Sequence, residues 1–562
     1  MSAPIRSAAG ERVDRWVRKC NKGWAVLKSR GPTQIQFWFI ALGIGVAAGG
    51  ITVLFRLGID WLQRLVYGAD DINTLHSFAA GLAWYHLLLV PMLGGLIVGI
   101  IFDRFTADGR VRSVADVIEG AALNEGRVEV RQGIASGFAS LITLSTGGST
   151  GREGPVVHLA AMISTAVSKL IRADGITGRD LLGCAVAAAV SASFNAPIAG
   201  ALFALEVVLR HFAVHAFAPI VIASVAGTII SRSVFGDVTE FVLPVANTLE
   251  FYVELPAYLI LGMLSGLVAV VLMQAVFWAE DFGNFFSEKF HIHRILRPAI
   301  AGAGLGALAI YFPHIIGVGY ETTSLALTGD LVLREAIVFV ALKIVAVAIT
   351  MGGRMGGGIF SPALMVGALT GLAFGIIATS IFPTVSGEET LYALAGMGAV
   401  AAAVLGAPIS TTLIVFELTG DWQTGLAVMV SVSLSTALAS ALVDRSFFLT
   451  QLERRNVHLA AGPQAYLLAT FKVASIMRER DAPNGAPEEA CWDLVSEGVY
   501  IDGNATLEQA MPMFEQANHR FVPVVTLGDQ DSPPELWGAL FQVDALKAMN
   551  KALSETAAEE HS

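Results

Sequence analysis

The chain has 562 residues, of which 54% are hydrophobic and only 15% are charged. A soluble domain normally carries about a quarter charged residues, so this composition excludes an ordinary soluble protein and favours a polytopic membrane protein, in which glycine is also common. The net charge of −11 reflects acidic residues in the C-terminal tail, which favour solubility and do not indicate nucleic acid as a partner. The three cysteines lie far apart, so no metal centre or disulfide framework is predicted.

Residues 1–35 are predicted to form a cytoplasmic N-terminal segment. They are polar and basic, and they lack the short apolar core of a cleavable signal peptide. Lys and Arg precede the first apolar run, which places this end in the cytoplasm by the positive-inside rule. The sequence therefore predicts an integral multi-pass protein of the plasma (inner) membrane with both termini cytoplasmic.

Residues 36–453 are predicted to be the transmembrane domain. A helix needs roughly 20 apolar residues to cross a bilayer, and several of the apolar runs here are too short to cross alone. Irregular backbone at membrane depth is tolerated only where it is buried or lines a wet cavity. The predicted interruptions of helices lie at 147–154, 195–197, 352–358 and 406–408.

The domain repeats itself. "AVSASFNAPIAGALFALE", which ends at Glu206, aligns without gaps with "VAAAVLGAPISTTLIVFE", which ends at Glu417. A weaker pair, "GREGP" and "GIFSP", precedes these segments. The two halves, about 36–240 and 250–445, predict a transporter architecture of broken, tilted helices with its site at the repeat interface. The repeats are inverted if each half holds an odd number of spans.

The stretch "STGGSTGREGPVVHLAA", residues 145–161, predicts an anion site built from backbone groups. Pro155 suits the first turn of a helix, so a helix is expected to start near Glu153. Gly151 and Gly154 let amides converge without obstruction by side chains. A helix N-terminus carries partial positive charge and unpaired N–H groups that bind anions.

The matching stretch "GGGIFSP" offers a second helix start, with the amides of Ile359 and Phe360. Glu153 then acts as a tethered anion, which occupies the site when charged and leaves it when protonated. An acid within the membrane is a functional candidate by default. The alternative is an interfacial carboxylate paired with Arg152, and His158 is read as a packed or edge residue.

On these motifs the chain resembles the CLC family of chloride channels and proton/chloride exchangers over residues 36–450. The resemblance implies a homodimer with inverted repeats and one anion pathway in each subunit. It assigns gating to Glu153 and anion binding to the backbone around the two helix starts. The residues it assigns to anion binding are Ser113, Gly151, Arg152, Gly154, Ile359, Phe360 and Phe448.

The chain departs from the family pattern in three places. Ser113 falls on the family's anion-coordinating serine, but in "RSVAD" the flanking glycines and proline are gone. Phe448 stands at the position of a tyrosine, so its hydroxyl donor is lost. The internal proton glutamate of the exchangers is replaced by Val207, next to Glu206, and valine carries no proton.

The tail, residues 454–562, is predicted to be a small cytoplasmic α/β domain. It reads as strand, helix and strand over 498–526, then strand and helix from 535 onward. It resembles a single CBS module with a long insert. No cofactor is predicted, and adenine nucleotide is doubtful because no Thr or Ser shortly precedes Asp544.

The sequence thus predicts a voltage- or proton-gated chloride channel with a pore gated by Glu153. The alternative is a proton/chloride antiporter in which Glu206 or water provides another inner proton route. An enzyme is disfavoured, because no nucleophile and base set or metal-ligand motif lies in the spans.

Overall fold

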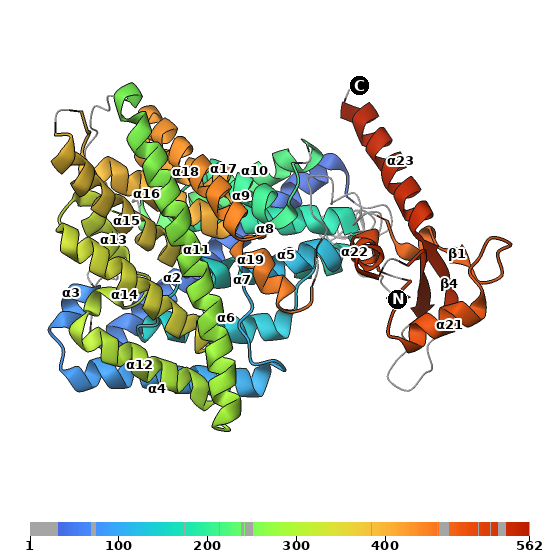
Figure 1. Cartoon of the computed structure of the whole chain (residues 1–562), viewed down its shortest axis with the longest axis horizontal. Coiled ribbons are helices and arrows are strands. Elements are labelled where there is room, and N and C mark those ends of the chain that lie inside the picture. Colours follow the sequence, from blue (N-terminus) through green and yellow to red (C-terminus); the bar gives the residue numbers. More distant parts are fainter. Residues whose placement is uncertain are drawn as a thin grey trace, which may run out of the picture.

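The computed structural model describes residues 32–68, 75–173, 175–212, 214–237, 241, 251–383, 385–457, 459, 471–503, 505–517, 519–526 and 535–560. These residues form a large helical domain followed by a small α/β region near the C-terminus, which lies beyond one end of the helical domain (Figure 1). This is the fold class that the sequence predicts. Most of the predicted N-terminal segment, residues 1–31, lies outside the described residues.

The helical domain is built from helices of very unequal length. In the described part of the chain, eight helices are long and apolar enough to cross a membrane. They are α2 (Gln34–Tyr67), α4 (Trp84–Phe105), α7 (Glu153–Ile171), α10 (Val214–Phe235), α11 (Phe251–Lys289), α14 (Leu333–Gly352), α15 (Phe360–Ile381) and α18 (Trp422–Leu442). The remaining elements of the domain are α3 (Leu75–Ala80), α5 (Val114–Leu123), α6 (Val130–Ser145), α8 (Gly175–Phe194), α9 (Pro197–Phe203), η2 (Ala204–Leu209), α12 (Leu296–Tyr311), η3 (Pro313–Ile315), α13 (Tyr320–Thr328), α16 (Glu389–Leu405), α17 (Pro408–Thr419) and α19 (Phe447–Glu453).

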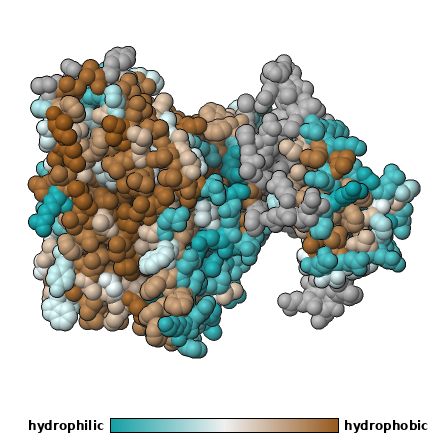
Figure 2. All heavy atoms as spheres, viewed as in Figure 1, coloured by the Kyte–Doolittle hydropathy of each residue, from teal (hydrophilic) through white to brown (hydrophobic). Residues whose placement is uncertain are grey.

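The outer surface of this domain is apolar. Figure 2 shows hydrophobic residues covering the face in view, while polar residues gather on the side that faces the C-terminal region. Large side chains such as Trp61 of α2 and Trp278 of α11 are 64% and 69% exposed. Exposure of that kind is stable in lipid, where apolar side chains meet acyl chains rather than water.

All four predicted interruptions are breaks between consecutive helices, at α6/α7, α8/α9, α14/α15 and α16/α17. The segment after the second break is not one regular helix. It is the short α9 followed by η2, a single π-helical turn that ends at Arg210 in a left-handed conformation. In this turn Val207 is buried, while the Glu206 carboxylate reaches α17.

The C-terminal region contains a four-stranded sheet in the order β1-β4-β3-β2, made of β1 (Arg478–Glu479), β2 (Ile501–Asp502), β3 (Phe521–Thr526) and β4 (Glu535–Phe541). With α22 (Leu507–Ala517) and α23 (Gln542–Glu560) it follows the predicted strand and helix order. The sequence did not predict β1 or α21 (Glu488–Ser496). An ion pair of 3.2 Å between Lys472 and Glu125 links this region to the helical domain.

Candidate functional site

The two glycine-rich motifs meet backbone to backbone. The amide of Gly151 donates to the carbonyl of Gly358 at 2.7 Å, and the amide of Gly358 donates back to Gly151 at 2.8 Å. Two residues later in each motif a helix begins, α7 at Glu153 and α15 at Phe360. The bridge therefore brings together two helix N-termini from the two halves of the domain, and their partial positive charges favour an anion between them.

Gly151 and Gly357 are required at this junction because neighbouring atoms lie too close for a side chain. A Cβ at Gly151 would lie 2.7 Å from Oε2 of Glu153 and 3.1 Å from the amide nitrogen of Ser361. Gly357 has a φ of +112°, and a Cβ on it would lie 2.2 Å from the Thr150 hydroxyl. The backbone can approach the site only because these side chains are absent.

The carboxylate of Glu153 occupies the region between the helix starts. Its side chain is buried, and Oε1 accepts hydrogen bonds from the Ser361 hydroxyl at 2.6 Å and the Tyr320 hydroxyl at 3.3 Å. Oε2 has no hydrogen-bond partner among the described residues. The carboxylate is therefore fixed at the helix starts by two hydroxyl groups.

The alternative reading of Glu153, an interfacial carboxylate paired with Arg152, fits the geometry less well. The Arg152 Nε lies 3.9 Å from Oε1 of Glu153, well beyond the 2.6 Å of the Ser361 bond. Both residues are buried, and Arg152 also donates to the carbonyl of Ser193 and lies over the Tyr320 ring. Arg152 therefore supplies a buried positive charge beside the site rather than a surface ion pair.

Two residues that contact Glu153 were not identified from the sequence. Ser361 lies inside the "GIFSP" motif, whose serine hydroxyl is the sequence signal for this contact. Tyr320 begins α13 far along the chain, and no sequence signal marked it. The loop that leads to Tyr320 is held by Lys343, which is buried and whose ammonium donates to the carbonyl of Gly317 at 3.1 Å.

Three other predicted anion ligands, Ser113, Ile359 and Phe360, lie at or beside the same helix starts. Ser113, the N-cap residue of α5, is buried, and its Cβ lies 3.5 Å from a Cβ built on Gly154. Ile359 and Phe360 are also buried. The Phe360 ring packs on Phe194 with 4.8 Å between ring centroids, so apolar surface closes one side of the α15 start.

Phe448 is buried on α19, which packs against α5. The nearby ends of α5 and α19 are joined by an ion pair of 3.0 Å between Asp116 and Arg455. The Phe448 ring has no group that can donate a hydrogen bond to an anion. Among the predicted anion ligands, Ser113 and Arg152 carry side-chain donors, and the others can offer backbone amides.

Phe448→Tyr is therefore expected to tighten chloride binding. A neutral hydrogen bond contributes about 0.5–1.5 kcal/mol net, which corresponds to roughly two- to tenfold in the dissociation constant. Isothermal titration of the purified variant with chloride measures this gain. Unchanged affinity in a folded variant would place Phe448 away from the anion.

The Glu206 and Glu417 carboxylates cap helices in the opposite repeat. Glu206 accepts hydrogen bonds from the amides of Ile409 at 2.9 Å and Ser410 at 2.8 Å, at the start of α17. Glu417 accepts from the amides of Ile198 at 2.9 Å and Ala199 at 2.7 Å, at the start of α9. The aligned acids of the two repeats thus play reciprocal structural parts.

Val207 follows Glu206 in η2 and is 6% exposed. Glu119, which the sequence analysis did not single out, lies half-buried on α5, and α5 packs directly against η2. Glu119 is therefore an acid on the helix that packs against the turn carrying Val207. His158 is buried with neither ring nitrogen hydrogen-bonded among the described residues, and it packs against Gly133.

A small basic cavity lies beside the second glycine motif. Its volume is about 50 Å³, and it is lined in part by Gly356 and Gly357. Its charged lining residues are Arg110, Arg354, Arg455 and Glu280. The excess of guanidinium groups raises the local concentration of anions next to the motif.

Removing the Ser361 hydroxyl is expected to increase flux at neutral pH. Ser361→Ala deletes the shortest hydrogen bond that holds Glu153 in the site, and a bond to a charged group contributes about 1.5–3 kcal/mol. Chloride efflux from vesicles measures the effect, with Thr370→Ala as a control because the buried Thr370 hydroxyl bonds only its own helix. Equal flux in wild type and Ser361→Ala would show that this bond does not hold the gate.

Comparison with known proteins identifies relatives of this chain. The family described as "Voltage gated chloride channel" matches residues 94–440. A putative chloride channel protein, ClcB-like, from Ralstonia nicotianae is 31% identical over 417 residues, covering 74% of this chain and 96% of that protein. The H(+)/Cl(−) exchange transporter ClcA of Vibrio parahaemolyticus is 26% identical over 435 residues, covering 76% and 91%.

Solved structures show the same fold. A slow cyanobacterial Cl⁻/H⁺ antiporter matches with a TM-score of 0.67 at 21% identity, over 75% of this chain and 98% of that one. A CLC-type fluoride/proton antiporter matches with a TM-score of 0.60 at 20% identity, over 73% and 97%. The extent of the family match and the similarity to the Ralstonia protein show that the chain belongs to the CLC family, described as voltage gated chloride channels.

Proposed function

We propose that the protein carries chloride across the membrane along a pathway gated by Glu153. The observation that carries the proposal is the buried Glu153 carboxylate, held between the N-termini of α7 and α15 by Ser361 and Tyr320. A charged carboxylate in this position excludes a free anion. Protonation removes its charge, so the positive helix ends then favour chloride.

We propose passive conduction, gated by protons or voltage, as the mode of transport. Coupled exchange needs a titratable or hydrated group between Glu153 and the cytoplasm. Val207 supplies none, and Glu206 already accepts hydrogen bonds from two amides of α17. Acid would then change the size of the current through Glu153 without driving it.

The reversal potential of the reconstituted protein in crossed chloride and pH gradients tests this mode. A channel gives a potential set by the chloride gradient alone at every imposed pH gradient. Uphill proton movement driven by a chloride gradient would reject passive conduction.

Proton-coupled exchange is the second candidate. The Vibrio relative is named an H(+)/Cl(−) exchange transporter, and two of the solved structures of this fold are antiporters. Within this chain, Glu119 lies on α5, the helix that packs against η2, and it is not one of the two helix-capping acids. If the reversal potential follows pH, Glu119→Gln is the first variant to test for lost coupling.

We further propose a homodimer in the plasma membrane, with both termini cytoplasmic and no enzymatic activity. The polar side of the membrane domain faces the C-terminal region, which supports a cytoplasmic tail (Figure 2). The tail is proposed to be a single CBS-like module without bound nucleotide. Its Asp544 carboxylate is paired with the Arg478 guanidinium at 2.6 Å and is not free for a ribose.

A further inference from the structure

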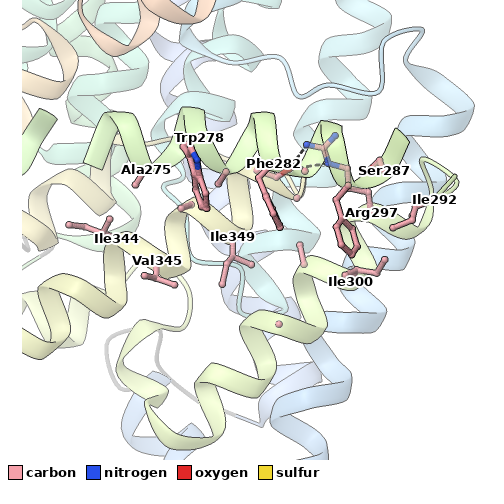
Figure 3. A pocket seen from close by; sticks show the side chains of 18 residues that line it. Ala275, Trp278, Phe282, Ser287, Ile292, Arg297, Ile300, Ile344, Val345 and Ile349 are labelled. Atoms are coloured by element: carbon pink, nitrogen blue, oxygen red, sulfur yellow. Dashed lines mark hydrogen bonds between the residues drawn. The ribbon is translucent and has the colours of Figure 1, made fainter. Parts of the chain in front are cut away.

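A large cavity opens on the outer surface of the membrane domain between α11, α12 and α14. Its volume is about 460 Å³. Trp278 and Phe282 project into it from α11, opposite Ile349 of α14 and Ile300 of α12, and Arg297 lies at one end (Figure 3). Apart from Ser287 and Arg297, the lining side chains are apolar or glycine.

The position of this cavity limits what can fill it. α11 and α14 are both long enough to span a bilayer, and the rim side chains Trp278, Ile300 and Val345 are 69%, 50% and 48% exposed. The cavity therefore faces the lipid phase. Apolar cavities are not filled by water at low cost, whereas an acyl chain fits the shape and chemistry of the lining.

The polar end of the cavity carries excess positive charge. A second cavity of about 100 Å³ shares Ser287, Ile292 and Arg297 with the first. Its charged lining residues are Arg294, Arg297 and Arg354 together with a single carboxylate, Asp103.

The Asp103 carboxylate is already paired with Arg294. Arg297 and Arg354 donate instead to neutral oxygens. Arg297 bonds the Gly352 carbonyl at 2.6 Å and the Asn284 side chain at 2.6 Å, and Arg354 bonds the same Asn284 oxygen at 3.2 Å. The buried Nε of Arg354 has no partner among the described residues. Among the described residues, these two guanidinium groups therefore have no hydrogen-bonded carboxylate.

This charged end lies where the helices leave the bilayer. α11 ends at Lys289 and α12 begins at Leu296, so Arg294 and Arg297 lie in or next to the turn between two membrane helices. Basic side chains at this depth meet lipid headgroups.

We propose that the joined cavities bind an anionic phospholipid of the surrounding bilayer. One acyl chain lies in the larger cavity against Trp278 and Phe282. The phosphate lies in the smaller cavity near Arg294, Arg297 and Arg354. The site is distinct from the Glu153 site, although Arg354 also lines the small basic cavity beside the second glycine motif. Its occupancy does not depend on the mode of chloride transport.

Native mass spectrometry of the purified full-length protein, titrated with phosphatidylglycerol or phosphatidylcholine of identical acyl chains, tests the proposal. Wild type is expected to retain phosphatidylglycerol about tenfold more strongly than phosphatidylcholine. Gly304→Leu should abolish this excess, because Gly304 is an exposed lining residue with no atom within 4 Å of an added Cβ. Gly43→Leu on α2 is the matched control, since Gly43 is equally open but lies outside the cavity. Val345→Trp fills the cavity from α14 as a second, independent variant.

Variants that remove single positive charges test whether the arginine side chains bind the lipid phosphate. Arg354→Gln, which removes a guanidinium that bonds neutral oxygens, should remove the preference for phosphatidylglycerol, whereas Lys289→Gln, which removes a charge outside both cavities, should preserve it. Equal retention of the two lipids by wild type would overturn the proposal, as would unchanged retention in both filling variants. A preference that survives Arg354→Gln would overturn the placement of the phosphate.

Discussion

Glu153→Gln is expected to give a chloride flux that is high at neutral pH and nearly independent of pH. The wild-type carboxylate competes with chloride for the two helix starts, and it is held there by the Ser361 and Tyr320 hydroxyls. Glutamine has nearly the same size but no charge, so the helix dipoles favour chloride over it. If the competition amounts to ~1.4 kcal/mol or more, flux at neutral pH rises by about tenfold or more.

Efflux from reconstituted vesicles over a series of pH values measures this effect, and wild-type flux should rise as pH falls. Glu254→Gln is a matched control, because Glu254 is another buried acid that accepts a hydrogen bond from a tyrosine, Tyr392, at 3.1 Å. That variant should keep the acid activation of wild type. A Glu153→Gln protein that remains as acid-activated as wild type would show that the gate is a different group.

The helix starts around Glu153 could be predicted because their determinants are local. Pro155 fixes an early position of α7, and glycines before it permit the backbone geometry. The internal repeat then indicated that "GIFSP" provides a second start. The bridge between Gly151 and Gly358 confirms that the two motifs meet, which local signals alone did not establish.

The contacts that regulate the site could not be predicted because they join distant segments. Tyr320 reaches Glu153 only through the loop that Lys343 holds, and no spacing in the sequence encodes that contact. The aligned acids Glu206 and Glu417 were visible as a repeat, but their partners lie in the opposite half. In the tail, β1 has two residues, too few to show the alternation of a strand.

Removing either of the reciprocal helix caps, Glu206 or Glu417, is expected to have a large effect on stability rather than on transport. Glu206→Gln is expected to destabilise the membrane domain by about 2 kcal/mol, because a hydrogen bond to a charged group contributes about 1.5–3 kcal/mol. Glutamine has only one side-chain oxygen, so its NH₂ group would face one of the two backbone N–H groups that now donate to Glu206. Two donors facing each other cannot form a hydrogen bond. Glu417→Gln removes the equivalent cap from α9 and should destabilise the domain to a similar extent.

Thermal unfolding in detergent measures the loss, and the reversal potential separates a cap from a proton carrier. If Glu206 serves only as a cap, Glu206→Gln and Glu417→Gln both lower the unfolding temperature, and both leave the response of the potential to pH as in wild type. If Glu206 carries protons, only the Glu206→Gln variant changes that response. Glu206 adjoins Val207, the substituted proton position, whereas Glu417 does not. A Glu206→Gln protein of full stability with altered coupling would therefore reject the structural role, and would make the exchanger reading the better one.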